Sequence, residues 1–177
     1  ASPAVKRPGR AKRSDAPTMS GNENTIFFWG HGPGSGDAAC LSNFYDQAPF
    51  TDEAGTCYPT SEHCFMAAKA RQFGDADALA AILAAKNPKQ AKALGRQVRD
   101  FDPAVWASVA RERMYEACLL KFRQSRRERA FLLSTGKALL VEASPFDTIW
   151  GIGLGAKQAR MTPREEWPGI NWLGEVL

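Results

Sequence analysis

A carboxylate and an amine stand seven residues apart, at Glu62 and Lys69, in a segment that favours a helix. This spacing is nearly two helical turns, so both side chains lie on one face, about 10 Å apart along the axis. Because helical side chains lean toward the N-terminus, Lys69 leans back toward Glu62, and the two groups could meet over one bound molecule. In a partly apolar pocket each would shift the pKa of the other, and desolvation would favour the neutral, nucleophilic amine. The spacing alone favours the alternative, a solvated Glu and Lys on an exposed face.

A second segment that could bind a ligand is the D-x-x-W-G-x-G pattern of Asp147, Trp150, Gly151 and Gly153. A tryptophan can stack on a flat base, and flexible glycines let backbone N–H groups approach a ligand oxygen. The alternative is a tryptophan packed in the core with a turn behind it. The residues alone do not separate these two interpretations.

Cys57, His63 and Cys64 suggest a metal site, but their spacing does not support one. Neighbouring residues of a helix point about 100° apart, and neither a zinc-ribbon nor a deaminase spacing is present. The stretch GIGLGA fits a nucleotide-cofactor pattern without the βαβ unit or the acidic residue that should follow. We therefore expect neither a metal nor a cofactor. His63 by itself could be a general acid or base, although capping or packing at the helix start is favoured.

The elements that must position these residues are mostly helices. The helix of Glu62 and Lys69 is capped by Thr60 or Ser61 and ends near Gly74. The apolar stripe of a longer helix, over 103–124, recurs at three- and four-residue steps and should form the backbone of the core. The fold class is therefore α+β, predominantly helical, in a compact single domain with a small β-sheet. Further predicted elements are strands at 25–29 and within 138–143, a hairpin over 50–58, helices at 75–85, from 87–88 onward and at 126–134, and short helices within 163–167 and 171–177.

The charge is concentrated at the start of the chain. Residues 1–18 hold five basic side chains and one acid, so they carry the whole formal charge of +4. We expect residues 1–24 to be a disordered basic tail, either a solvated extension or a tether for nucleic acid. The four cysteines match no disulfide framework, which predicts reduced thiols in a cytoplasmic protein. The sequence holds no apolar run long enough to span a membrane.

Several ordered motifs resemble one known family. Its L-S-N-F and P-T-S-E-H-x-x-x-A-x-K signatures are matched by Leu41-Ser42-Asn43-Phe44 and by Pro59-Thr60-Ser61-Glu62-His63 with Ala67 and Lys69. This is the NADAR domain family, the YbiA-like N-glycosidases. The resemblance covers about residues 25–177 and continues in order through Gly95-Arg96, Trp106, Met114, Lys121-Phe122, Leu140-Val141-Glu142, the D-x-x-W-G-x-G pattern and Gly169-x-Asn171-x-Leu173-Gly174.

The resemblance implies hydrolysis of a bond between ribose C1′ and an exocyclic amine, without a metal. On one route Lys69 attacks as a nucleophile while Glu62 transfers protons. On the other, Glu62 activates water and Lys69 is an electrostatic anchor. Asp147 would position or protonate the leaving group. The residues implied in substrate binding are Asn43, Phe44, His63, Trp106, Trp150, Gly151 and Gly153.

Three functions remain open at this level. The leading one is hydrolysis of ribosylamino-pyrimidine phosphates, the early intermediates of riboflavin biosynthesis. The second is removal of ADP-ribose from guanine in DNA, and the third is a binding module that senses a nucleotide derivative without turnover. The near-neutral domain favours a small molecule, since contact with nucleic acid phosphates normally requires a basic surface. The sequence makes no prediction of the oligomeric state.

Overall fold

The computed structural model describes residues 24–177, so nearly all of the predicted basic tail lies outside the described residues. Most of the helices and strands lie where local sequence signals predict them. They are β1 (Thr25–Phe28), η1 (Pro33–Ser35), η2 (Asp37–Leu41), β2 (Phe50–Thr51), β3 (Cys57–Tyr58), α1 (Ser61–Gln72), α2 (Ala76–Leu83), α3 (Pro88–Gly95), α4 (Pro103–Gln124), α5 (Arg126–Ser134), β4 (Leu139–Glu142), α6 (Ala156–Ala159), η3 (Arg164–Glu166) and α7 (Trp172–Val176).

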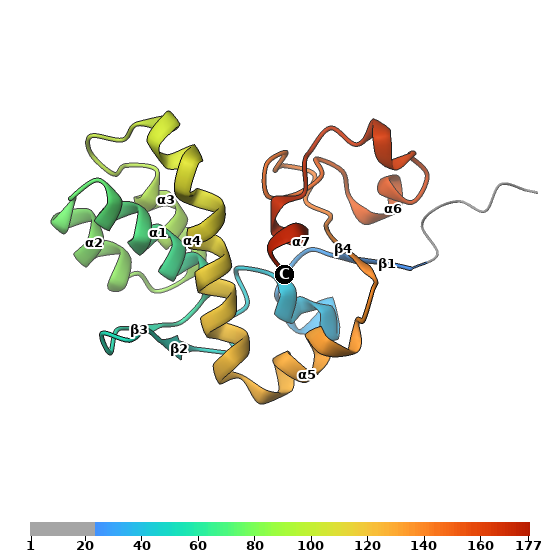
Figure 1. Cartoon of the computed structure of the whole chain (residues 1–177), viewed down its shortest axis with the longest axis horizontal. Helices are drawn as coiled ribbons and strands as arrows, with labels where there is room; N and C mark the ends of the chain where they lie inside the picture. The colour runs from blue at the N-terminus through green and yellow to red at the C-terminus, as the bar shows by residue number, and fades with distance from the viewer. Residues whose placement is uncertain (1–23) are drawn as a thin grey trace, which may run out of the picture.

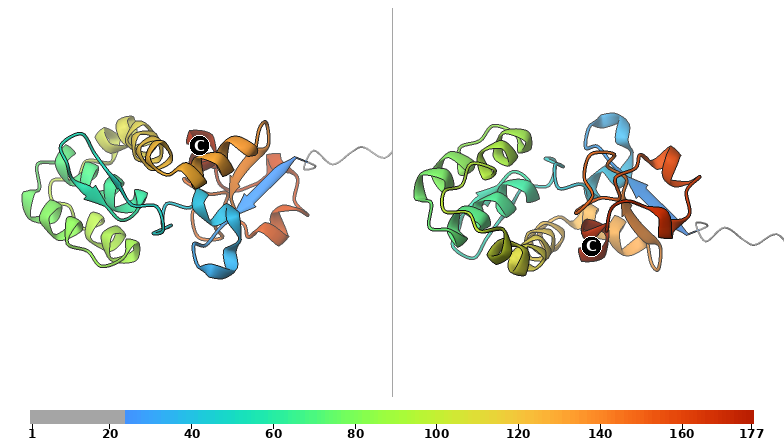
Figure 2. Two further views of the ribbon diagram at one scale, coloured as in Figure 1. Left: turned by 90° about the horizontal axis from the view of Figure 1, so that it is seen from below. Right: turned by 90° about the horizontal axis from the view of Figure 1, so that it is seen from above.

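The elements form two groups with the long helix α4 beside both. Helices α1 to α3 and the β2–β3 hairpin lie on one side of the molecule, and β1, β4, α6 and α7 lie on the other (Figure 1). The same division is visible from below and from above (Figure 2). Helix α4 packs against α1 in the first group and α7 in the second, and leads into α5. This arrangement places the start of α1 opposite the ends of β1 and β4.

Local capping explains where the helices begin. The Thr60 hydroxyl accepts the backbone N–H of His63 at the start of α1, and Gly74, with φ of +68°, follows its end. Asn87 and Asp102 cap α3 and α4 and are each followed by a proline at the first helical position. These caps confirm the boundaries expected from the sequence.

The strands form two separate pairs. The hairpin β2–β3 is antiparallel, with Gly55 at φ +83° in its turn as expected. The other pair, β1 and β4, is parallel and aligns Thr25 with Leu139 and Phe28 with Glu142. This long-range pairing was not predicted, and it makes both strands end at the same edge. Also unpredicted are the short helical turns η1 and η2 and helix α6, which lies just after the glycine-rich segment.

Asn171 binds the free edge of β4 with its side chain. Its Nδ2 donates to the Leu140 carbonyl at 2.9 Å, and its Oδ1 accepts the Glu142 N–H at 3.0 Å. The residue has a left-handed backbone, with φ of +58°. A Cβ on Gly174, in the next turn of α7, would overlap the Leu140 carbonyl, so the helix sits directly against the strand. The amide of Asn171 therefore replaces a neighbouring strand.

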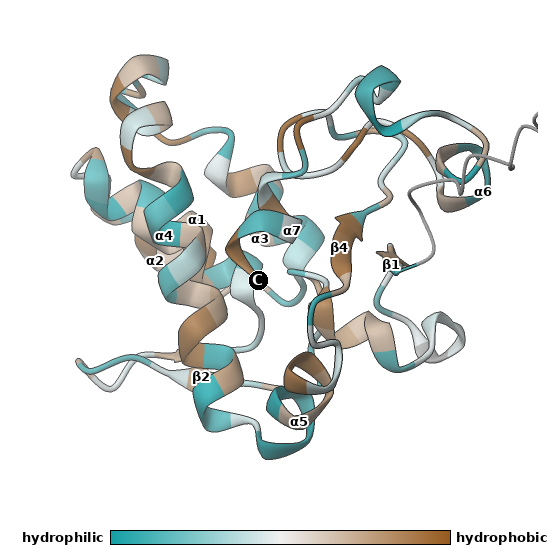
Figure 3. Ribbon diagram, turned by 45° about the vertical axis from the view of Figure 1, so that its right-hand side comes forward, coloured by the Kyte–Doolittle hydropathy of each residue, from teal (hydrophilic) through white to brown (hydrophobic). Residues whose placement is uncertain are grey.

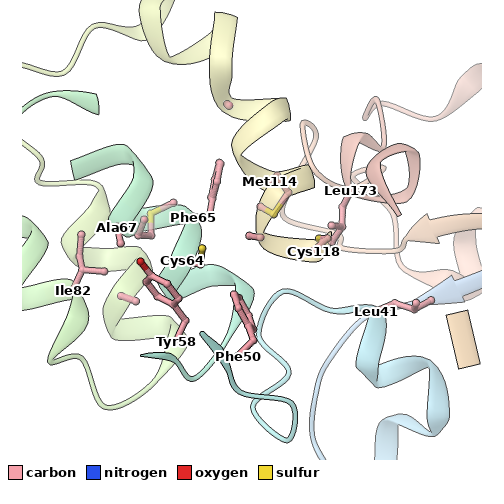
Figure 4. Close-up of a cluster of buried hydrophobic side chains, with 14 of the residues drawn as sticks. Leu41, Phe50, Tyr58, Cys64, Phe65, Ala67, Ile82, Met114, Cys118 and Leu173 are labelled. Carbon is pink, nitrogen blue, oxygen red and sulfur yellow. The ribbon is translucent and has the colours of Figure 1, made fainter. Parts of the chain in front are cut away.

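The main hydrophobic core joins the two groups of elements. Figure 4 shows Phe65 and Ala67 on α1, Met114 and Cys118 on α4, and Leu173 on α7 among its members. In Figure 3 the strand β4 is one of the most hydrophobic segments, as a buried strand should be. All four cysteines are unpaired in the structure, in agreement with the expected free thiols. Within residues 24–177 no helix is both long and apolar enough to cross a membrane.

One residue of the predicted apolar stripe on α4 is a fully buried lysine. Lys121 donates from Nζ to the carbonyls of Cys40, at 2.8 Å, and Ser42, at 3.2 Å. The Cys118 thiol, one turn earlier, lies 3.9 Å from the Asn43 Oδ1. A buried amine requires such acceptors. Helix α4 therefore holds the segment 40–43 by hydrogen bonds as well as by apolar packing.

We expect Asn171→Ala to destabilise the protein, because it leaves two buried backbone groups of β4 unsatisfied at about 1–3 kcal/mol each. Asn171→Gly is the matched variant, since it loses the same hydrogen bonds and relieves the left-handed backbone. It should fall between wild type and Asn171→Ala in urea unfolding. Equal stability of Asn171→Gly and wild type would contradict the role of the side chain.

Candidate active site

A cavity of about 870 Å³ lies where the carboxyl ends of β1 and β4 face helices α1 and α3. Ligands of parallel sheets commonly bind beyond the carboxyl ends of the strands. Helix α4, the segments 42–44 and 144–150 and Leu173 of α7 complete the wall. Most of the residues singled out from the sequence meet here, namely Asn43, Phe44, Glu62, Lys69, Trp106, Asp147 and Trp150.

Glu62 is a buried carboxyl group at the start of α1, with 4% of its surface exposed. Burial raises its pKa to about 7, the negative charge of Asp147 acts in the same direction, and the positive charges of Lys92 and Arg96 oppose it. Its backbone N–H donates to the Asn43 carbonyl at 3.1 Å. A carboxyl group with this pKa can both take up and release a proton near neutral pH.

Lys69 is also buried, and burial lowers its pKa, with a further lowering from the charge of Arg96. Its Nζ lies 3.8 Å from the centre of the Phe101 ring. We expected Glu62 and Lys69 to shift the pKa of each other, but this expectation was wrong. The cations that act on Glu62 are Lys92 and Arg96, and the charge that acts on Lys69 is that of Arg96. The amine lines the cavity but is turned toward an aromatic ring at its present rotamer.

Asp147 holds the turn that carries Trp150. Its Oδ1 accepts the backbone N–H groups of Ile149 and Trp150 at 3.0 and 2.8 Å, and its Oδ2 lies 3.8 Å from Lys92 Nζ. Both oxygens of this carboxyl group therefore already have partners. The residue is in the cavity as expected, with an evident positioning role.

An aromatic cluster forms the apolar wall of the cavity. The Phe65 ring contacts Trp106 and Trp150 at centroid distances of 5.0 and 5.1 Å, and Trp172 packs edge-to-face on Trp150 at 5.6 Å. Trp150 is thus partly packed in the core and partly lines the cavity, and its stacking on a ligand stays a prediction. Its ring is held in place before any ligand binds.

Three expected binding residues do not line the cavity. His63 is buried on the other side of α1, where Nδ1 lies 2.7 Å from the Thr60 hydroxyl and Nε2 lies 3.2 Å from the Ala85 carbonyl. This position is the one expected of a packing or capping residue. Gly153 donates its N–H to the Asp147 carbonyl in a turn with φ of +71°, and Gly151 is buried against Glu142. Neither glycine is among the residues that line the cavity.

Other residues of the cavity had no role predicted from the sequence. Lys92 and Arg96 stand one turn apart at the end of α3, a spacing that places both on one face and could have indicated an anion site. Glu142, the last residue of β4, lines the cavity together with the exposed rings of Trp29 and Phe146, whose centroids are 6.2 Å apart. The pairing of β1 with β4 brings these residues together, and no local signal encodes it.

No group of three or more His, Cys, Asp or Glu side chains that could hold a metal ion occurs within residues 24–177. The cavity nevertheless holds carboxyl groups, amines and aromatic rings in one place. Such a set can transfer protons, supply a nucleophile and bind a flat anionic ligand.

Comparison with known proteins identifies the family. A family model described as the NADAR domain matches residues 27–177. The chain belongs to the NADAR domain family. It is 43% identical over 120 residues to N-glycosidase R617 of Acanthamoeba polyphaga mimivirus, in a match that covers 68% of this chain and 71% of that protein. The chloroplastic riboflavin biosynthesis protein PYRR of Zea mays is 33% identical over 147 residues, covering 77% of this chain and 22% of that protein.

Among solved structures, the fold is similar to that of the E. coli protein YbiA, determined by NMR. The TM-score is 0.66 at 31% sequence identity, over 89% of this chain and 82% of YbiA. The α+β, mainly helical architecture predicted from the sequence is thereby confirmed.

Because the pKa of Glu62 is raised, we expect the contribution of this residue to the stability of the protein to decrease as pH rises. Between 4.5 and about 7 the native carboxyl group keeps a proton that the unfolded chain has lost, so the free energy of unfolding decreases as pH rises through this range. Glu62→Gln removes this titration. We expect the stability of the variant relative to wild type to increase by on the order of 2–3 kcal/mol between about pH 5 and pH 8.

Urea unfolding at several pH values measures this difference. Glu53→Gln, which replaces an exposed glutamate of the hairpin turn, is the control. A difference between Glu62→Gln and wild type that stays constant with pH would contradict the assignment.

Proposed function

We propose that this NADAR domain is an N-glycosidase that hydrolyses the bond between ribose C1′ and an exocyclic amine. The observation that carries the proposal is the buried Glu62 carboxyl group, with its pKa near 7, in a cavity that also contains the buried amine of Lys69. The names of its relatives as N-glycosidases support the same reaction class. The side chains of the cavity supply the proton transfer and the nucleophile, so we expect turnover to persist with a chelator present.

The reaction begins with opening of the sugar, helped by the lone pair of the exocyclic amine. The neutral Lys69 amine then adds to C1′ and expels the base, and water releases the sugar from the resulting lysine imine. Glu62 accepts and returns the protons that these steps exchange. The lowered pKa of Lys69 supports this route, which requires its side chain to rotate away from Phe101. If Lys69 forms no bond, Glu62 activates water directly and the lysine acts through its charge.

The substrate we propose is a ribosylamino-pyrimidine phosphate of riboflavin biosynthesis. A flat pyrimidine suits the wall formed by Trp106 and Trp150, and the phosphate on its ribose suits Lys92 and Arg96, which line the same cavity. The similarity to a riboflavin biosynthesis protein supports this choice. Free cysteines are compatible with a reducing cytoplasm, where we place the reaction.

We expect ribose 5-phosphate to be released from 5-amino-6-ribosylaminouracil 5′-phosphate, because the cavity offers both an aromatic wall and two cations. The parallel assay measures release of ADP-ribose from ADP-ribosylated guanine in DNA, with chelator present in both. Faster ADP-ribose release would assign the chain to repair of DNA. Turnover of neither substrate would contradict the glycosidase and favour a binding module.

Glu62→Gln should reduce kcat by about a hundredfold or more, the usual loss when a proton-transfer group is removed. In wild type, borohydride added during turnover should reduce the imine and leave the sugar on Lys69, as detected by peptide mass spectrometry. Lys69→Ala should abolish this adduct. If the active enzyme yields no adduct, the result supports direct attack by water. If Glu62→Gln turns over substrate at the wild-type rate, Glu62 is not the proton-transfer group.

A further inference from the structure

Glu142 combines a place in the cavity with an unsatisfied carboxyl oxygen. It lines the cavity as the last residue of β4. Its Oε2 is buried and has no hydrogen-bond partner among residues 24–177. A buried polar atom without a partner is costly, and native proteins keep few of them. Because the residue lines the cavity, a ligand bound there could supply the missing partner of its carboxyl group.

The backbone holds Glu142 in a fixed position. Its N–H donates to the Asn171 Oδ1, its carbonyl accepts the Ile152 N–H at 3.0 Å, and its strand neighbour is Phe28. A Cβ on Gly151 would stand 2.8 Å from the Glu142 carbonyl oxygen and 3.1 Å from its Cγ. The side chain thus lies directly against the backbone of the following loop. Gly151 is required for this close approach, which explains a glycine that does not itself reach the cavity.

The surroundings of Glu142 favour the protonated form. Its pKa is raised to about 8, mainly by burial; the charges of Asp147 and Glu62 act in the same direction, and those of Lys92 and Lys121 oppose them. A carboxyl group that keeps its proton near neutral pH is a hydrogen-bond donor. The carboxyl group can therefore offer a proton to a basic atom of a ligand.

The leaving nitrogen of the proposed reaction needs such a proton. The resemblance pointed to Asp147 for this task, but its Oδ1 accepts two backbone N–H groups and its Oδ2 faces Lys92. We infer that Glu142 is the general acid that protonates the leaving nitrogen, an inference that rests on the proposed function. Glu62 is then left to serve the incoming nucleophile, so the two carboxyl groups divide the proton transfers.

The step balances on either route to the product. As the C1′–N bond breaks, its electron pair stays on the nitrogen, which takes the proton of Glu142 and leaves as a neutral amine. Water supplies a hydroxyl group to C1′ and gives its remaining proton to the Glu62 carboxylate; exchange with solvent then removes this proton from Glu62 and returns one to Glu142. The net reaction consumes one water, and no oxidant, reductant or further reactant is needed.

The test compares leaving groups of different basicity. The substrates are the 5-phosphates of N-ribosylaniline and N-ribosyl-4-nitroaniline, because nitroaniline needs less help from an acid as it leaves. We expect Glu142→Gln to lose about 10²–10⁴-fold in kcat with aniline and much less with 4-nitroaniline. Asp147→Asn is the matched control from the same cavity, and its loss should be equal for the two substrates because it positions the turn. Glu142→Asp, which keeps the acid but withdraws it by one methylene, should show a smaller loss with the same selectivity.

The pH profile gives a second readout. The wild-type rate should decline on the alkaline side as Glu142 loses its proton, and this limb should be absent in Glu142→Gln. The other titratable groups that act on Glu142 are Glu62 on α1, Lys92 on α3, Lys121 on α4 and Asp147 in the following loop. They remain in the variant, so a limb that persists belongs to one of them and contradicts the inference.

Three results would overturn the assignment of Glu142. An equal loss on both substrates means a structural role, and no loss means no role. Should Glu142→Gln fail to fold, as judged by circular dichroism, an unselective Glu142→Asp would decide against the assignment. The proposed function fails separately, if wild type releases ribose 5-phosphate from neither aryl substrate nor the pyrimidine.

Discussion

A fully buried lysine amine can be accommodated only where acceptors surround it, and this requirement at Lys121 determines how the site is assembled. Its hydrogen bonds to the carbonyls of Cys40 and Ser42 attach the segment before Asn43 to the long helix α4. The Asn43 carbonyl in turn accepts the N–H of Glu62 at the start of α1. Glu62 is thus connected to the longest helix of the fold through two sets of hydrogen bonds, joined by the backbone of residues 42–43.

The cavity contains two buried carboxyl groups that come from different elements and have different surroundings. Glu62 lies at the start of a capped helix, and the charges of Lys92 and Arg96 at the end of α3 oppose the increase of its pKa by burial. Glu142 lies at the end of a strand whose backbone is held by Asn171. Burial raises the pKa of both, to about 7 and about 8. Pairs of titratable groups in distinct surroundings are typical of sites that need an acid and a base together.

The sequence predicted what local chemistry determines. Caps such as Thr60 and Asn87, the turn at Gly55 and the apolar repeat of α4 all act within a few residues, and their elements appear as expected. The same repeat could not show that Lys121 is buried, because its acceptors lie some eighty positions earlier. The burial of the Glu142 oxygen and the close approach of Gly151 to this residue were equally hidden, since both follow from contacts across the fold. The motif residues therefore indicated most of the cavity lining, whereas the burial and contacts of each residue depend on tertiary packing.

The parallel pairing of β1 with β4 also has a consequence for biosynthesis. β1 can pair only after β4 has been synthesised, because Thr25 aligns with Leu139. Helices α1 to α4, in contrast, pack mainly on elements close to them in the chain. Contacts between distant residues form late because closing a long loop costs entropy. On the ribosome the helical half can condense while the strand that carries Glu142 is still being synthesised. Until Glu142 has been synthesised and β4 has paired with β1, the cavity lacks one of its buried carboxyl groups.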